Sequence, residues 1–209
     1  MAVTVNLAET ILALVAATPS FDLRERKRTR TRLMIQAEAL RLFAEKGYAS
    51  TTVEEIADAA AISPRTFFRY FPTKEDVVFW DQYDPVAFEM FDARPADEPL
   101  AVSLRAVIRE TLGGLYRHDP ERLRTRLRLA ATVPELRARF LVEQRHGVEL
   151  FVEKRPDLDR LRLRVIGMAL LGAVALALET WQEQGGKDDP VVLVDQALDA
   201  LAEGIAPLS

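Results

Sequence analysis

The chain of 209 residues contains no cysteine and only two histidines. Without cysteine it can form no disulfide framework, zinc ribbon or thiol nucleophile, and this composition fits a reducing cytoplasm. His118 and His146 have no second histidine or carboxylate at metal-ligand spacing, so we expect surface or hydrogen-bonded histidines. A glycine-rich phosphate loop and a paired acid–base motif are also missing. We therefore expect no enzyme, no metal site and no cofactor.

Long hydrophobic runs are missing as well. The longest, residues 165–178, has 14 residues and is flanked by Arg164 and Glu179, whereas a bilayer span needs about 20 residues. We therefore predict a buried helix there and no membrane partner. The apolar stretch within residues 1–22 is preceded by no Lys or Arg, so we interpret this segment as an N-terminal extension and not as a signal peptide. A cytoplasmic protein is expected.

The formal net charge of −4 conceals an uneven distribution. Residues 24–80 hold 11 Lys and Arg against 8 Asp and Glu, so the rest of the chain carries the acidic excess. Within residues 24–32, six cations are opposed by Glu25 alone. A charge run by itself is more typical of a solvated helix face, but this one directly precedes the motif described below. That position favours contact with a polyanion.

Helical periodicity dominates the chain, and we find no strand series and no internal repeat. The sequence therefore predicts an all-α fold. The stretch 122–129 alternates like a strand, but Pro120 and Pro134 bracket it at helical length, so we interpret it as a helix. Predicted helices span residues 24–46, 63–71, 100–116, 120–131, 134–154, 158–183 and 190–205. A short helix that begins after Thr51 or Thr52 runs through Ala60, and another opens at Thr73 or Lys74 and is interrupted or terminated by Asp84-Pro85.

Residues 48–78 predict a helix-turn-helix. Thr51 and Thr52 each have a glutamate three positions later, which is the capping-box pattern, and Ser63 precedes Pro64 at the start of the next helix. Helices this short must pack against each other and against the first helix. The residues spaced for that packing are Val53, Ile56, Ala57, Ala60, Ile62, Phe67 and Phe71.

The opposite face of the second short helix then points away from this core. It presents Arg65, Thr66, Phe68, Arg69 and Tyr70. Two exposed aromatic rings beside two arginines indicate a docking surface. The major groove of DNA accepts one helix, where arginine pairs with guanine and an apolar side chain contacts a thymine methyl group.

The run T-T-V-x-x-I-A-x-A-A-x-I-S-x-x-T-F-F-x-Y-F-x-x-K-E-D-V, beginning at Thr51, resembles the DNA-binding signature of TetR-family regulators. The resemblance covers about fifty residues, 28–78. It implies that Arg65, Thr66 and Phe68 enter the groove, that Phe67 belongs to the core, and that Tyr70 and Lys74 touch the DNA backbone. The full set expected to bind DNA is Arg24, Arg26, Lys27, Arg28, Arg30, Thr51, Thr52, Ser63, Pro64, Arg65, Thr66, Phe68, Arg69, Tyr70 and Lys74.

One position departs from the family pattern, because Ala61 stands where the turn usually has glycine. We expect Ala61 either to adopt a positive φ, at a cost of roughly 1 kcal/mol, or to shift the turn slightly.

The resemblance also implies an architecture: an N-terminal three-helix DNA-binding domain, residues 23–72, and a helical ligand-binding and dimerisation domain, residues 73–209, that dimerises through its last two long helices. Gly167, Gly172 and neighbouring alanines permit close helix packing there. An apolar stripe on the final helix adds Val191, Val194, Leu198, Leu201 and Ile205. A homodimer with a four-helix interface is expected.

Many large apolar residues of the second domain are candidates for a ligand pocket, although each is more typical of plain core packing. Their richness in Phe and Met favours a small apolar ligand over a sugar or nucleotide. The candidates are Phe88, Met90, Phe91, Leu104, Ile108, Leu112, Tyr116, Phe140, Phe151, Met168, Leu171 and Trp181.

Six arginines, at positions 122, 124, 126, 128, 137 and 139, leave two interpretations open. They form a cationic mouth for a phosphate-bearing ligand such as an acyl-CoA thioester, or a solvated helix face paired with nearby acids. The Thr66–Phe71 run and the Trp-containing long helix resemble an actinobacterial subgroup that includes acyl-CoA-responsive regulators.

The function implied is a sequence-specific regulator that binds a double-stranded DNA operator and is a repressor released by a small apolar, acyl-CoA-like ligand. The alternative is a helical ligand- or partner-binding module without DNA binding.

Overall fold

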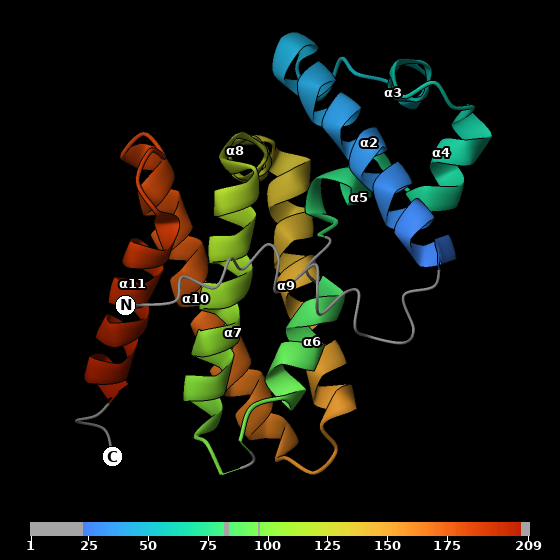
Figure 1. Ribbon diagram of the computed structural model, residues 1–209. Coiled ribbons are helices and arrows are strands. Elements are labelled where there is room, and N and C mark those ends of the chain that lie inside the picture. The colour runs from blue at the N-terminus through green and yellow to red at the C-terminus, as the bar shows by residue number, and fades with distance from the viewer. Residues whose placement is uncertain (1–22, 82–83, 96, 206–209) are drawn as a thin grey trace, which may run out of the picture. The chain divides into compact units, whose positions relative to one another are not determined.

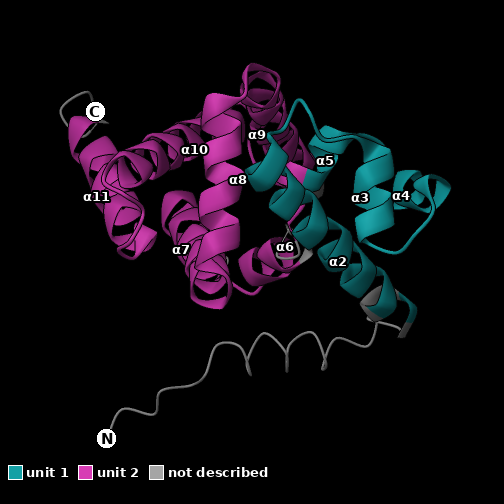
Figure 2. Ribbon diagram, turned by 90° about the horizontal axis from the view of Figure 1, so that it is seen from above, with its two compact units in different colours: residues 1–77 teal, residues 78–209 magenta. Residues whose placement is uncertain are grey.

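The computed structural model describes residues 23–81, 84–95 and 97–205, and every regular element within them is a helix (Figure 1). The predicted all-α fold is confirmed. The chain forms two compact units, residues 1–77 (unit 1) and residues 78–209 (unit 2), shown in different colours in Figure 2. The N-terminal extension predicted for residues 1–22 lies outside the described residues.

Unit 1 is built from α2 (Leu23–Lys46), α3 (Val53–Ala59), α4 (Pro64–Tyr70) and the start of α5 (Lys74–Phe79). The short helices share one core with α2 because none of them buries enough surface alone. Among its buried apolar residues are Ile35, Ala39, Leu42, Phe43, Ile56, Ala57, Ala60, Phe67 and Phe71. The packing inferred from the motif is thus present for Ile56, Ala57, Ala60, Phe67 and Phe71.

Side-chain caps set the starts of the two short helices. Thr52 caps α3, and the box is closed on both sides, since Thr52 Oγ1 accepts from Glu55 N (3.2 Å) and Glu55 Oε2 accepts from Thr52 N (3.0 Å). Ser63 caps α4 by accepting from Thr66 N at 3.1 Å. Ala61, between them, has a φ of +52°, so the first of the two expectations for this position is confirmed.

Unit 2 contains α6 (Asp84–Asp92), α7 (Leu100–His118), α8 (Pro120–Thr132), α9 (Pro134–Lys154), α10 (Arg160–Glu183) and α11 (Pro190–Ile205). The bounds of α7 to α11 lie within two residues of the predicted ones, and the alternating segment 122–129 is helical, whereas no separate helix was predicted for α6. The predicted fourth helix, 74–84, was wrong at its end, since α5 stops at Phe79. Arg126 of α8 explains the stop: its guanidinium donates to the carbonyls of Val78 (2.7 Å) and Phe79 (3.1 Å).

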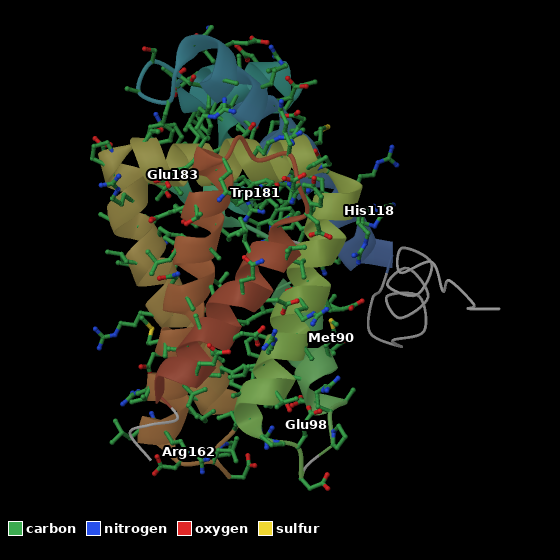
Figure 3. The ribbon with its side chains drawn as sticks, turned by 90° about the vertical axis from the view of Figure 1, so that its left-hand side faces the viewer. Met90, Glu98, His118, Arg162, Trp181 and Glu183 are labelled. Carbon is green, nitrogen blue, oxygen red and sulfur yellow. The ribbon has the colours of Figure 1, made fainter. Side chains whose placement is uncertain are left out.

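Helix α10 runs the length of unit 2, with Arg162 near one end and Trp181 and Glu183 at the other (Figure 3). By length and composition it is apolar enough to cross a membrane, and 22% of its most apolar window is buried. The prediction of a buried helix therefore holds for one face only. Leu163, Leu170, Ala177, Leu178 and Trp181 are buried, whereas Leu161, Val165, Met168 and Leu176 face outward.

The apolar stripe expected at a dimer interface lies instead inside the protomer. Val194 and Leu198 of α11 are buried in a cluster with Leu170 and Leu178 of α10. A face that already packs against α10 is no longer available to a second copy, so this part of the interface prediction was wrong.

The two glycines of α10 also differ. A Cβ at Gly167 would meet the Val148 side chain at 3.1 Å, so Gly167 serves the packing of α9 against α10. A Cβ at Gly172 meets nothing within 4 Å.

Candidate nucleic-acid interface and ligand cavity

Helix α4 presents a polar and aromatic face to solvent. Arg65 and Arg69 are exposed, Thr66 and Tyr70 are half-buried, and Phe68 is 52% exposed. The adjacent Phe67 is fully buried. The helix therefore divides its residues as the sequence pattern predicts, with the aromatic core on one side and a free surface on the other.

Local contacts hold this free surface in place. The rings of Phe67 and Phe68 meet edge to face with their centroids 5.5 Å apart, so the buried ring supports the exposed one. The Arg69 guanidinium lies over the Tyr70 ring, 5.2 Å from its centroid. At the N-terminus, Ser63 Oγ and Thr66 Oγ1 are 2.9 Å apart. Such pre-ordering lowers the entropy lost when a helix docks on a partner.

The basic cluster lies on the first turns of α2. Arg24, Lys27, Arg28 and Arg30 are exposed, and the side chain of Arg26 lies outside the described residues. Four exposed cations on a single helical segment suit the phosphate backbone of DNA, which binds through charge and counterion release rather than through base contacts.

The structure places two other predicted DNA contacts inside unit 1. Thr51 is 1% exposed and donates its hydroxyl hydrogen to the Gly47 carbonyl at 2.9 Å. Lys74 Nζ donates to the carbonyls of Tyr48 (2.9 Å) and Thr51 (3.0 Å) and lies 4.1 Å above the Tyr48 ring. Both residues fix the loop that precedes α3. Thr52 is exposed, and its hydroxyl oxygen caps α3.

Tyr48 is the residue that sequence reasoning missed in this region. It is buried, its ring meets Phe43 at 5.0 Å, and its hydroxyl donates to Glu75 Oε1 at 2.6 Å. Partial burial raises the pKa of Glu75, but hydrogen bonds from Tyr48 and others outweigh it, so the pKa of Glu75 is lowered. The Tyr-to-Glu spacing of 27 residues gives no periodic signal in the sequence.

Unit 2 encloses an apolar cavity of about 440 Å³. Its walls come from α6, α7, α9 and α10, with Arg126 of α8 and Phe79 at the end of α5. Phe88 and Phe151 stack there with centroids 5.7 Å apart. Six of the predicted pocket residues line it: Phe88, Leu104, Ile108, Phe140, Phe151 and Leu171. A volume of this size is within the range of small-molecule sites.

The remaining predicted pocket residues are not brought to this cavity. Tyr116 and Trp181 pack edge to face and donate to the carbonyls of Lys187 (2.7 Å) and Asp188 (2.6 Å). Leu112 packs against the α10–α11 core, and Met168 is 40% exposed. Met90 is half-buried on α6, and Phe91 borders a second cavity.

Four polar side chains in the apolar cavity were not among the predicted pocket residues: Thr111, Arg126, Glu143 and His146. Arg126 bonds Asp81 at 2.8 Å, and Glu143 pairs with Arg139 at 2.7 Å. Arg126 belonged to the alternating arginine run, which was the available signal. Within the described ranges, no group of three side chains gathers that could hold a metal ion.

The arginine run does not converge on one mouth. Arg124 donates to the Gly186 carbonyl at 2.7 Å, Arg137 donates to the Ala131 carbonyl at 2.7 Å, and Arg128 is exposed. Of the six arginines, Arg126 lines the apolar cavity and Arg137 a smaller one of about 50 Å³. The interpretation as a helix face engaged with its neighbours fits these contacts better than a shared cationic mouth.

A second, more polar cavity of about 590 Å³ lies at the α6–α7 and α9–α10 loops, the end of unit 2 where Figure 3 shows Glu98 and Arg162. Its charges are largely compensated. Arg94 pairs with Glu98, and Arg155 pairs with Asp157 at 2.7 Å. Hydrogen bonds from Arg94 and Ser103 hold the pKa of Glu98 below its usual value.

Both units are similar in sequence to known regulators. The tetR family of bacterial regulatory proteins matches residues 35–79, and the MftR C-terminal domain family matches residues 98–206. The HTH-type transcriptional regulator TcmR of Streptomyces glaucescens is 34% identical over 170 residues, which is 71% of this chain and 75% of TcmR. The regulator MftR of Mycobacterium tuberculosis is 27% identical over 200 residues, 88% of this chain and 96% of MftR.

Solved structures share the fold. FadR of Thermus thermophilus, a repressor solved with lauroyl-CoA, superposes with a TM-score of 0.53 at 26% identity, covering 83% of this chain and 94% of FadR. NalD of Pseudomonas aeruginosa, the secondary repressor of a multidrug efflux pump, superposes with a TM-score of 0.56 at 23% identity, covering 84% and 97%.

Proposed function

The chain belongs to the TetR family of bacterial regulatory proteins and is a DNA-binding transcriptional regulator, and we propose that it is a repressor released from its operator by a small apolar ligand bound in the unit 2 cavity. The observation that carries this proposal is an apolar cavity with room for a ligand in a chain whose α4 leaves a cationic, aromatic face free. As a regulator of transcription it acts where the chromosome is, in the cytoplasm.

Members of this family dimerise and bind operators. We place the dimer interface on the outward face of α10, which exposes Leu161, Val165 and Leu176 beside the open Gly172. Apolar side chains that are more than half exposed along one helix gain free energy when a second copy covers them, at about 25 cal/mol per Å² of apolar surface.

On DNA, α4 of each protomer enters one major groove, with Arg65, Thr66 and Phe68 toward the bases and Tyr70 toward the backbone. The cations at the start of α2 hold phosphates. Two half-sites about 34 Å apart are required for both helices to bind at once. A ligand that favours another separation of the two α4 helices therefore lowers operator affinity by shifting the population of dimers.

The ligand class follows from the cavity wall. Stacked phenylalanines and aliphatic side chains favour an apolar body, and FadR of T. thermophilus, 26% identical, was solved with lauroyl-CoA. The apolar part of an acyl-CoA-like molecule suits this cavity, whereas the arginines of α8 and α9 bind protein neighbours and offer no common phosphate site.

The DNA part of the proposal is tested by selecting duplexes from a random library with the purified full-length chain. We expect a palindromic consensus whose half-sites lie one helical turn apart. Enrichment of single half-sites only, or no enrichment, contradicts the dimeric operator model.

The ligand part is tested with the selected operator. Native mass spectrometry of the purified chain looks for a retained apolar molecule, whose addition is expected to release the operator. Gly147 lines the cavity at an exposed position of α9, and a Cβ there meets nothing within 4 Å, so Gly147→Leu is designed to narrow the opening of the cavity without a clash at Cβ. This variant is expected to bind the operator normally and to ignore the ligand, while Gly147→Ala responds as the unaltered chain does. Release of Gly147→Leu at the same ligand concentration argues against the cavity.

A further inference from the structure

The charges in the apolar cavity are paired, and this limits what it can bind. Arg126 and Asp81 form an ion pair whose side chains are 13% and 15% exposed, and Glu143 pairs with Arg139. An added carboxylate beside Arg126 would bring uncompensated negative charge into a largely apolar space. Burial of an unpaired charge is costly, so the cavity disfavours an anion even though it contains arginine.

Arg126 nevertheless keeps hydrogen-bonding capacity. A guanidinium has five N–H donors. Arg126 uses one at Nε for the Val78 carbonyl, one at Nη1 for Asp81 and one at Nη2 for the Phe79 carbonyl. One N–H on each terminal nitrogen is left, and Arg126 lines the cavity.

We propose that Arg126 selects the ligand: the preferred molecules are uncharged and apolar and carry a carbonyl oxygen that accepts hydrogen bonds from the two remaining N–H groups of this guanidinium. The inference rests on the proposed function of the cavity. A neutral carbonyl satisfies the donors without disturbing the charge balance with Asp81, whereas a pure hydrocarbon leaves them unsatisfied.

The same contact gives the ligand a route to the DNA-binding unit. Arg126 holds the last carbonyls of α5, and the first residues of α5 belong to unit 1. A ligand carbonyl on the two remaining N–H groups restrains the guanidinium while its bonds to Val78 and Phe79 persist. The end of α5 is then held more firmly when the cavity is occupied.

Three probes of similar length separate the chemistry: methyl decanoate, decanoate at neutral pH, and undecane. Displacement of Nile red from the delipidated full-length chain measures binding. We expect methyl decanoate to bind about tenfold or more tightly than either of the others, since a hydrogen bond to a charged group contributes about 1.5–3 kcal/mol. Equal binding of methyl decanoate and undecane overturns the role of Arg126, and tighter binding of decanoate overturns the preference for an uncharged ligand. If no probe displaces Nile red, the proposed ligand cavity itself fails.

Substitutions at Arg126 and at its partner Asp81 test whether Arg126 selects the ligand. Asp81→Asn keeps Arg126 and removes its compensating charge, so the preference should shift toward decanoate by about tenfold. The double variant Arg126→Met with Asp81→Asn should bind methyl decanoate and undecane equally and should lose operator release by the ester. Arg128→Met, on the exposed face of the same helix, is the matched control and should keep the original order of probes. An unchanged ratio of decanoate to methyl decanoate affinity in Asp81→Asn contradicts the proposal even if the double variant fails to fold.

Discussion

Unit 1 and unit 2 differ in how their side chains divide between structure and function. In unit 1, buried and exposed side chains are neighbours in the sequence. Phe67 is buried and the adjacent Phe68 is 52% exposed, so one short helix supplies both a core residue and a surface residue. In unit 2 a residue's role depends on distant partners, as with Val194, which packs on α10, and Arg126, which holds the end of α5. A local pattern specifies the free face of α4, whereas assembly of several helices specifies the cavity and the outward face of α10.

The largest expected effect comes from the exposed face of α10. Leu176→Glu should leave the protomer folded, because the side chain is 65% exposed, but should place an unpaired charge at the dimer interface. We expect a monomer by light scattering and a fall in operator affinity of about a thousandfold or more, toward the non-specific level. Val102→Glu, at an exposed apolar position of α7, should change neither. A dimer that persists in Leu176→Glu places the interface elsewhere.

The next effect separates base contacts from phosphate contacts within unit 1. Arg65→Ala should cost about 1–3 kcal/mol per half-site and relax the preference at one base position. Lys27→Ala should weaken all sequences alike and reduce the slope of affinity against salt by about 1. Fluorescence anisotropy with consensus and altered duplexes over a salt series measures both. If Arg65→Ala weakens every duplex equally, α4 does not read bases through this residue.

A pH-dependent prediction concerns the bond from Tyr48 to Glu75. Tyr48→Phe should lower the free energy of unfolding at neutral pH by about 1.5 kcal/mol, because a hydrogen bond to a charged acceptor is lost. The pKa of Glu75 is lowered in the folded state, so the bond's contribution is present above the unfolded pKa of about 4.3 and disappears as the pH falls through the folded value.

Urea unfolding at neutral pH and at several values below about 4.3 checks this difference. Tyr116→Phe is the control in unit 2, because Tyr116 donates to a neutral carbonyl. The loss of unfolding free energy in this variant should be independent of pH over this range. A pH-independent penalty in Tyr48→Phe would show that Glu75 does not accept the bond as a carboxylate.

The smallest expected effect lies in the turn between α3 and α4. Ala61→Gly removes the strain of φ +52° but adds freedom to the unfolded chain, so we expect a net gain of about 0.5 kcal/mol. Ala37→Gly, at an exposed position inside α2, should instead lose about 0.5–1 kcal/mol. Thermal unfolding compares the two variants. Destabilisation of equal size at both positions would contradict the strain at Ala61.

Much of the exposed face of α4 was predictable because its determinants are close in sequence. The caps at Thr52 and Ser63, the proline at α4 N1 and the alternation of buried and exposed aromatics each act over three or four residues. The contacts of Lys74 within unit 1 could not be predicted, because Lys74 donates to carbonyls 26 and 23 positions away and no sequence periodicity reports such a separation.

The sequence by itself determined that the chain is all helical, where most helices begin and end, and which face of α4 remains free, because caps, prolines and hydrophobic periodicity are local forces. Tertiary structure alone decided that α5 ends at Phe79, that the α11 stripe packs inward and that Arg126 lines the cavity. Those outcomes depend on which helices meet and which carbonyls a distant guanidinium reaches, and three-dimensional packing sets both.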